Sequence, residues 1–328
     1  MKKLLLWGSM ALLWACTPDD APLPESVQAE TPQITQESTP KGVQMRVSSS
    51  SRLSNHFQNW LSANGYGSDD FANGPSYGGR SSSSDPVNQQ PVIFIHGNSD
   101  DATGWDESID YFRNNGYRTS ELYAITWGPA DASQAANQYH SYAYLTRVRR
   151  FIQAVKAYTG ASKVDVIGHS MGVTLGRKAI KGGTAYDAAV GGNYNLGSRL
   201  SFVDTFVGIA GGNRGLTACY YASGSATCSD RNGFYPGYIY WGTGPYNVSD
   251  LLTGLNNDPN KEGSYVYSIW STADQIIGYG CIVYGQNTCR IPGQNGERAF
   301  YSAPYGHFGV KDLTGYYQLR MVRDHQTN

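Results

Sequence analysis

One stretch of the sequence tightly restricts the local path of the chain, because an apolar strand ends in a glycine-containing turn and continues as a helix. Residues 163–173 read K-V-D-V-I-G-H-S-M-G-V. Glycines two positions before and two after Ser170 let the chain reverse between strand and helix. They also place the serine at a helix N-terminus, where free N–H groups favour developing negative charge. We therefore predict that Ser170 is an acyl-transfer nucleophile, and the alternative is a structural turn.

The sequence contains a second match to G-x-S-x-G, which serves as an internal control. Residues 74–78 read G-P-S-Y-G. No apolar strand precedes this match, it contains a proline, and it lies in a stretch rich in glycine and serine. We therefore interpret Ser76 as a loop residue, and the context rather than the pattern singles out Ser170.

Apolar runs alternate with helical patterns over the rest of the chain. The runs predict strands at 91–96, 164–167 and 202–210, and the run at 91–96 is continuous, as expected for a strand that is buried on both faces of a parallel sheet. Further strands are expected at 122–127, 265–270 and 298–302, and a final helix carries Val310, Leu313, Tyr317 and Met321 on one face. The alternation predicts an α/β fold with a mostly parallel, doubly wound sheet in a single domain. In such a sheet, ligands bind beyond the carboxyl ends of the strands.

A serine nucleophile needs a histidine to accept its proton and a carboxylate to orient that histidine. After an elbow of this kind the acid comes first and the histidine last. His307 lies in a loop between the last strand and the last helix, whereas His325 is expected to belong to a frayed tail. Asp274 alone follows a core strand closely. Asp204, Glu262 and Glu297 precede strands and so belong to the wrong edge of the sheet. Asp187 lies in a glycine-rich connection after the elbow helix, and a polar, tyrosine-rich stretch contains the remaining candidates, Asp230, Asp250 and Asp258. We therefore predict Ser170, Asp274 and His307 as a catalytic triad, with a packed loop histidine as the alternative for His307.

Two backbone N–H groups are needed to bind the oxyanion of the tetrahedral intermediate. We predict those of Met171, directly after the nucleophile, and Asn98, in the loop after the first core strand. Because the main chain does this work, the side chain at position 98 is expected to be free to vary. His96 is expected to brace this loop, and His169 to line the pocket.

The N-terminus has the features of an export signal. A basic start and an apolar run precede L-W-A-C at 13–16, which resembles the lipobox of bacterial lipoprotein precursors. We predict a signal peptide at 1–15, lipid-modified Cys16 followed by a flexible tether to residue 50, and a catalytic domain at 51–328. The protein would then be exported and anchored to a bacterial membrane, in the outer membrane or at the cell surface. An ordinary secretory signal with a chance cysteine is the alternative.

Four cysteines remain when Cys16 is set aside. In an exported chain an even number of cysteines indicates disulfides, and four allow three pairings. The short gaps favour Cys219 with Cys228 and Cys281 with Cys289. Metal binding is the weaker interpretation, because no histidine lies at ligand spacing beside either pair.

The charge distribution limits the range of partners. The net charge is −1, and the densest basic group is Arg147, Arg149 and Arg150, which we interpret as a solvated helix face. We therefore expect no nucleic-acid partner. No cofactor, metal or obligate protein partner is evident from the sequence.

Five blocks of sequence resemble the class 2 lipases in order and context. They are P-V-I-F-I-H-G, G-A-S-K-V-D-V-I-G-H-S-M-G, G-I-A-G-G-N-R-G, S-I-W-S-T-A-D-Q and G-H-F-G-V, within about residues 91–323. The resemblance implies an α/β-hydrolase fold and hydrolysis of triacylglycerol or other carboxylic esters. It also carries over Ser170, Asp274 and His307 as the triad, with Asn98 and Met171 at the oxyanion hole.

The chain differs from small members of that family by a long tyrosine-rich stretch at about 217–262, which we call the aromatic insertion. It could be a lid, a surface that docks substrate, or a passive loop held by a disulfide. The leading hypothesis is an exported serine esterase or lipase acting on an ester or lipid substrate. The alternatives are a depolymerase of aliphatic polyesters and a surface-binding lipoprotein without catalysis, and a peptidase is a weaker one.

Overall fold

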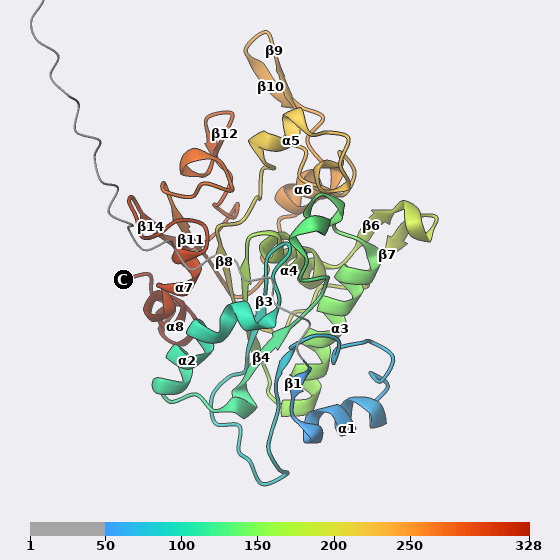
Figure 1. Cartoon of the computed structure of the whole chain (residues 1–328), viewed down its shortest axis with the longest axis vertical. Coiled ribbons are helices and arrows are strands. Elements are labelled where there is room, and N and C mark those ends of the chain that lie inside the picture. The colour runs from blue at the N-terminus through green and yellow to red at the C-terminus, as the bar shows by residue number, and fades with distance from the viewer. Residues whose placement is uncertain (1–49) are drawn as a thin grey trace, which may run out of the picture. The chain divides into compact units, whose positions relative to one another are not determined.

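An eight-stranded sheet forms the centre of the fold in a computed structural model that describes residues 50–328 (Figure 1). The predicted signal peptide, Cys16 and nearly all of the tether lie outside the described residues. The strand order is β1 (Arg52–Leu53), β2 (Tyr77–Gly78), β4 (Leu122–Ile125), β3 (Val92–Ile95), β5 (Val164–His169), β8 (Val203–Ile209), β11 (Tyr265–Ser271) and β14 (Gly296–Phe300). Neighbouring strands are parallel except β2 and β4. The prediction of a mostly parallel α/β fold is confirmed.

Helices cover both faces of this sheet, and the strand sequences reflect it. Within β3, Val92 and Phe94 pack into one hydrophobic cluster and Ile93 and Ile95 into the other. The first cluster includes residues of α2 (Asp106–Asn114), α7 (Gly309–Asp312) and α8 (Gly315–Asp324). The second includes residues of α1 (Asn55–Ala63), α3 (Tyr142–Thr159), α4 (Met171–Lys181), α5 (Thr217–Tyr221) and α6 (Asp250–Asn257). Burial on both faces explains why the strand is apolar at every position rather than at alternate ones.

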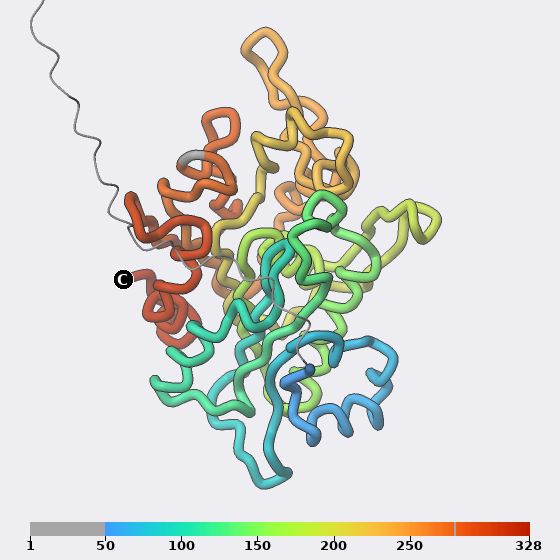
Figure 2. The backbone as a smooth tube through the Cα atoms, viewed as in Figure 1, coloured from blue at the N-terminus to red at the C-terminus, as the bar shows by residue number. Residues whose placement is uncertain are grey.

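Shorter elements lie in the connections between these strands and helices, and the colour of the tube in Figure 2 follows the course of the chain through them. Three hairpins are formed by β6 (Thr184–Asp187) with β7 (Gly192–Asn195), β9 (Tyr238–Tyr240) with β10 (Thr243–Tyr246), and β12 (Ile282–Val283) with β13 (Gln286–Asn287). Disulfides join Cys219 to Cys228 and Cys281 to Cys289, which confirms the predicted pairing. Among residues 50–328, none of the helices has the length and apolar character needed to cross a bilayer.

The C-terminal segment differs from the prediction of one amphipathic helix. The helix is interrupted at Leu313 and Thr314, and the Leu313 side chain is 54% exposed instead of facing the core. Gly315 then packs so closely on α2 that an added Cβ would lie 2.7 Å from Cγ of Tyr111. The first residue of α8 therefore packs directly on α2, where a side chain larger than that of glycine would clash.

Two further expectations about charged groups are wrong. The Arg149 side chain is buried, and its guanidinium donates hydrogen bonds to the carbonyl oxygens of Ala179 and Ser198. His325 is not in a frayed tail, since its ring stacks on Tyr265 with 3.7 Å between the ring centroids. Both side chains find partners that are distant in the sequence, so local charge spacing cannot reveal them.

Candidate active site

The elbow at Ser170 forms as predicted, with β5 ending at His169 and α4 beginning at Met171. Ser170 itself has φ 53° and ψ −124°, which is a sparsely populated conformation for a residue with a side chain. It lies at the centre of the sheet, because β5 is flanked by β3 and β8. By contrast Ser76 precedes the short strand β2, and its buried hydroxyl accepts a hydrogen bond from the N–H of Thr126.

The glycine after the serine is required by close packing. A Cβ at Gly172 would lie 2.3 Å from the carbonyl oxygen of Ile95 and 2.4 Å from that of His96. Such distances are shorter than any real contact, so a side chain here would push α4 away from the end of β3. Similarly, a Cβ at Gly97 would lie 2.9 Å from Cβ of Ser170. The serine and the loop after β3 therefore lie directly against each other.

Asp274 and His307 come together although 33 residues separate them. Nδ1 of His307 lies 2.8 Å from Oδ2 of Asp274, and both side chains are almost completely buried, at 3% and 0% exposure. The other carboxylate oxygen, Oδ1, accepts hydrogen bonds of 2.8 Å from the N–H groups of Ile276 and Ile277. The carboxylate is thus held in one orientation, and it fixes the imidazole with Nδ1 protonated and Nε2 free to accept a proton.

The residue next to the serine connects the elbow to His307. Nε2 of His169 donates to the carbonyl oxygen of His307 over 2.9 Å, and the two ring centroids are 4.6 Å apart. The N–H of His307 also donates to Oε1 of Gln275 over 3.1 Å. Within residues 50–328, no hydrogen bond links the Ser170 hydroxyl to His307; such bonds commonly tighten only when substrate binds.

The two predicted oxyanion donors belong to segments that adjoin Ser170. Met171 is the first residue of α4, so its N–H has no acceptor within the helix. Asn98 follows Gly97, in the loop that contacts the serine. The two N–H groups therefore belong to the segments that flank the serine, as an oxyanion hole requires.

The side chain of Asn98 has hydrogen-bond partners that the sequence did not predict. Its Nδ2 donates to the carbonyl oxygen of Ala135 over 2.9 Å, and its Oδ1 accepts from the Ser99 hydroxyl over 3.0 Å. Oγ1 of Thr227, in the aromatic insertion, lies 2.6 Å from the same Ala135 carbonyl oxygen and 2.6 Å from that of Gln138. This shared acceptor, in the 3-10 helix η3 (Ala132–Asn137), connects the loop after β3 to the insertion. No local pattern in the sequence signals this link.

The two histidines that precede the serine have structural contacts. His96 stacks on the Trp127 ring, and its Nε2 accepts a hydrogen bond from the backbone N–H of Trp127, as expected of a residue that braces the loop. His169 was expected to line the pocket, but it is buried and supports His307 instead. Burial lowers the pKa of both imidazoles, so that both are neutral near pH 7.

The carboxylates that competed with Asp274 in the sequence have other partners. Asp204 pairs with Lys163, Glu297 with Arg290, and Asp250 with Arg231. Asp187 caps the short helix η4 (Ala188–Val190) through the N–H of Ala189. These acids serve local structure, and Asp274 is the carboxylate that contacts His307.

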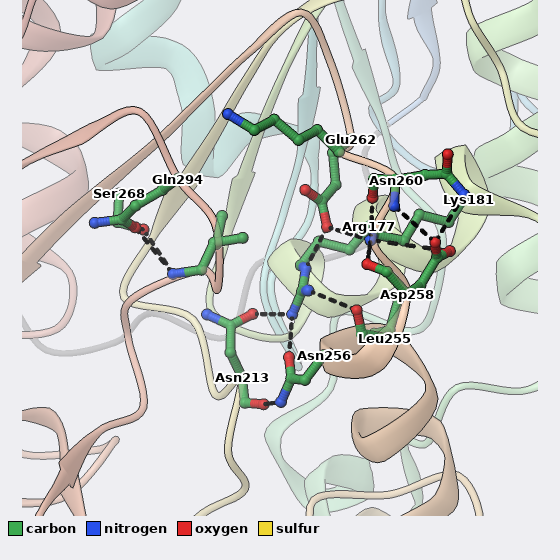
Figure 3. A network of polar contacts seen from close by, with 12 residues as sticks. Arg177, Lys181, Asn213, Leu255, Asn256, Asp258, Asn260, Glu262, Ser268 and Gln294 are labelled. Carbon is green, nitrogen blue, oxygen red and sulfur yellow. Dashed lines mark hydrogen bonds and ion pairs between the residues drawn. The ribbon is translucent and has the colours of Figure 1, made fainter.

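A buried ionic network ties the aromatic insertion to the elbow helix (Figure 3). Arg177 on α4 donates to Glu262 over 2.8 Å, and the two side chains are 1% and 2% exposed. Its guanidinium also donates to Asn213, Asn256 and the carbonyl of Leu255. The network joins the helix that presents Ser170 to the end of the insertion, so the position of one depends on that of the other.

Replacement of Arg177 by methionine is expected to lower the free energy of unfolding by about 3–5 kcal/mol, because Glu262 would stay buried without its hydrogen-bonded partner and would face only the more distant Lys181, at 3.6 Å. Urea denaturation followed by circular dichroism measures this change. Arg231→Met is the matched control, since its pair with Asp250 is solvent-exposed and water screens the attraction, so its loss should change the free energy of unfolding little. Equal losses in the two variants would contradict a special role for the buried network.

Comparisons with known proteins agree with this geometry. Residues 89–320 match the family model described as "Lipase (class 2)". No curated protein matches the chain significantly. Among solved structures, Aspergillus fumigatus lipase B is similar at 13% identity and a TM-score of 0.51, over 77% of this chain and 56% of that one. Bacillus licheniformis lipase BlEst2 in its mature form is 14% identical with a TM-score of 0.45, over 73% of this chain and 95% of that one. Paleococcus ferrophilus monoacylglycerol lipase is 13% identical with a TM-score of 0.46, over 76% of this chain and 98% of that one.

At 13% identity the similarity to the fungal lipase concerns the fold alone, and the chain spans just over half of that protein. The family model covers more than two thirds of the sequence, including the elbow, Asp274 and His307. An α/β-hydrolase sheet, a strained serine at the elbow and a matching family model lead to the same assignment: the chain belongs to the class 2 lipase family.

Proposed function

We propose that the protein is a serine carboxylic ester hydrolase that forms an acyl-enzyme on Ser170. The observation that carries the proposal is the buried hydrogen bond between Asp274 and His307, at the end of the sheet where the elbow presents Ser170. Membership of the class 2 lipase family supports an ester as the substrate. The same residues supply all three roles that acyl transfer by serine requires.

In the proposed mechanism, Oγ of Ser170 attacks the ester carbonyl carbon while Nε2 of His307 takes the hydroxyl proton. The N–H groups of Asn98 and Met171 bind the oxyanion that forms. Loss of one such donor typically raises the barrier by roughly 2.7–4 kcal/mol. Collapse of the intermediate expels the alcohol, which receives the proton from His307. Water, deprotonated by His307, then attacks the acyl-enzyme and releases the acid and Ser170.

For the substrate we propose triacylglycerol or shorter acyl esters. The exposed aromatic side chains of the insertion favour a second candidate, a depolymerase of aliphatic polyesters such as polyhydroxyalkanoates. Hydrolysis rates on emulsified triacylglycerol, on p-nitrophenyl esters of increasing chain length and on polyhydroxyalkanoate films distinguish the two. A film as the only substrate that is hydrolysed would favour the depolymerase.

The chemical test is labelling by a fluorophosphonate, which reacts with activated serines. We expect the probe to label the wild-type protein and to leave Ser170→Ala unlabelled. Ser76→Ala is the matched control, because Ser76 stands in the second G-x-S-x-G and its hydroxyl has only a structural hydrogen bond. Gel fluorescence after labelling measures the result. Absence of labelling in the wild type would favour a surface-binding lipoprotein without catalysis, whereas labelling that persists in Ser170→Ala would contradict Ser170 as the nucleophile.

We further propose that the protein is exported and anchored to a bacterial membrane through lipid on Cys16. The apolar run before L-W-A-C supports this, and two disulfides are typical of an oxidising compartment. Growth of the expressing bacterium with an alkyne fatty acid is expected to label the wild-type protein and not Cys16→Ser. Click chemistry and gel fluorescence detect the label. Equal labelling of both proteins would contradict the role of Cys16.

A further inference from the structure

The β9–β10 hairpin carries a group of exposed large apolar side chains, including Trp241, the most exposed among the described residues. Trp241 is 88% exposed and Tyr240 is 62% exposed, and the exposed side chains of Ile239 and Tyr246 lie on the same hairpin. In Figure 1 the hairpin extends away from the sheet, past α5 and α6. Contiguous exposed apolar groups are unfavourable in water and commonly mark a surface that contacts another phase or partner.

Hydrogen bonds at the tip and at the base of the hairpin hold the segment that carries these side chains. Trp241 and Gly242 form the turn with φ of 49° and 75°, the conformation of the tight turns that suit β-hairpins. Oγ1 of Thr243 lies 2.7 Å from the Tyr240 carbonyl oxygen and 2.9 Å from the Tyr246 hydroxyl. At the base, the Tyr284 hydroxyl donates to the Gly237 carbonyl over 2.7 Å. The tip therefore holds its tryptophan outward.

The hairpin carries no charge. Residues 232–249 contain no Asp, Glu, Lys or Arg, and the residues that flank them, Arg231 and Asp250, pair with each other at 2.8 Å. A segment that binds anionic membranes needs basic side chains. Uncharged Trp and Tyr are instead the residues that prefer the boundary between lipid and water, because their rings are apolar and their polar edges stay hydrated.

The insertion is linked to the loop beside Ser170. Nδ2 of Asn98 donates to the Ala135 carbonyl, and Oγ1 of Thr227 lies within hydrogen-bond distance of that carbonyl and of the Gln138 carbonyl. Arg177 connects α4 to Glu262 at the far end of the insertion. The Cys219–Cys228 disulfide and these contacts hold the insertion in place, whereas a lid must swing. The hairpin extends away from the sheet and is not folded over it, which also argues against a lid (Figure 1).

We propose that the β9–β10 hairpin inserts Trp241 and Tyr240 into an uncharged or zwitterionic lipid surface and so holds the protein at the phase that contains its ester substrate. A lipid surface can be penetrated, so a single protruding ring becomes buried in it. A solid polyester would contact the same ring only at its edge and is matched better by a flat array of aromatics. The binding step is independent of catalysis, while the link to the substrate rests on the proposed function.

The test is binding of the full chain to phosphatidylcholine vesicles, measured by co-sedimentation and by quenching of tryptophan fluorescence with brominated lipid. All proteins carry Cys16→Ser and Ser170→Ala, so that neither an attached lipid nor hydrolysis contributes. We expect the partition coefficient to fall about tenfold or more in Trp241→Asn, because the removed ring no longer leaves water. Asparagine tolerates a positive φ, so the turn should be kept. Tyr240→Ser gives a second, independent reduction.

Tyr301→Ser is the matched control, because this exposed aromatic lies outside the hairpin, just after β14. Its partition coefficient should equal that of the parent. Unchanged binding in both hairpin variants would overturn the proposal, as would much tighter binding to anionic vesicles that salt abolishes. The proposal would also be overturned, in favour of a solid polymer, if the two hairpin variants lost adsorption to polyhydroxyalkanoate film but still bound vesicles like the parent.

A kinetic measurement separates this proposal from the proposed function. In the protein with Ser170 intact, Trp241→Asn should slow hydrolysis of emulsified ester about tenfold and leave hydrolysis of a dissolved short ester unchanged. Equal slowing on both substrates would overturn the proposal. If vesicles are bound through the hairpin but no ester is hydrolysed, the lipid-surface role stands and the proposed hydrolase activity fails.

Discussion

Replacement of His307 by alanine is expected to lower kcat for a soluble p-nitrophenyl ester by a factor on the order of 10⁶. Without the imidazole, nothing accepts the proton of Ser170, and the hydroxyl is a poor nucleophile at neutral pH. The residual rate should come from ester binding and the oxyanion donors alone. Steady-state kinetics with a spectrophotometric assay measures the change.

His325→Ala is the control for this variant, since His325 is the other histidine that follows Ser170 in the sequence. Its ring stacks on Tyr265 and faces Asp204, so its loss should affect stability and leave kcat near the wild-type value. The assignment of the general base would fail if His325→Ala caused the larger loss of kcat, or if His307→Ala retained most of the activity.

Replacement of Asp274 by asparagine is expected to lower kcat about 10⁴-fold without unfolding the protein. The amide oxygen can still accept hydrogen bonds from the N–H groups of Ile276 and Ile277, so the loop after β11 should keep its shape. The amide NH₂ would instead face Nδ1 of His307 and favour the tautomer that is protonated at Nε2. That tautomer cannot take the proton from Ser170.

Kinetics of Asp274→Asn should be read beside a thermal melt, which separates loss of catalysis from loss of fold. Asp250→Asn is the matched control, because Asp250 also follows the serine in the sequence but pairs with Arg231 at the surface. We expect its kcat to stay within about twofold of the wild type, since it contacts no predicted catalytic residue. A large loss of kcat in Asp250→Asn and none in Asp274→Asn would contradict the assignment of the acid.

Features that depend on local conformation could be read from the sequence. The strand before Ser170 has Val164, Val166 and Ile167 directed to both faces because both faces of β5 are buried, and the second glycine of the elbow is needed because Gly172 contacts the backbone at the end of β3. Chain order and position after a strand then selected Asp274 and His307, which the structure brings to 2.8 Å from each other. Their catalytic roles remain predictions that the variants above test.

Features that depend on distant contacts could not be read in this way. The spacing of Leu313 fits a helical face, but close packing of Gly315 on Tyr111 accompanies a break in the helix there. Arg149 stands in a basic cluster yet is buried against carbonyl groups of other segments. In each case the environment is created by residues that are remote in the sequence, and periodicity carries no information about them.

The sequence by itself determined the parallel α/β sheet, the elbow at Ser170 and the order of the predicted triad, because these follow from burial periodicity, turn geometry and chain direction. Only the tertiary structure decided that the Asn98 side chain shares a carbonyl with Thr227, that Arg177 and Glu262 tie the aromatic insertion to α4, and that Trp241 stands exposed at a hairpin tip. The physical reason is that hydrogen bonds, ion pairs and exposure depend on which distant segments meet. The pattern of residues along the chain predicts the helices and strands, but it does not predict which of them come into contact.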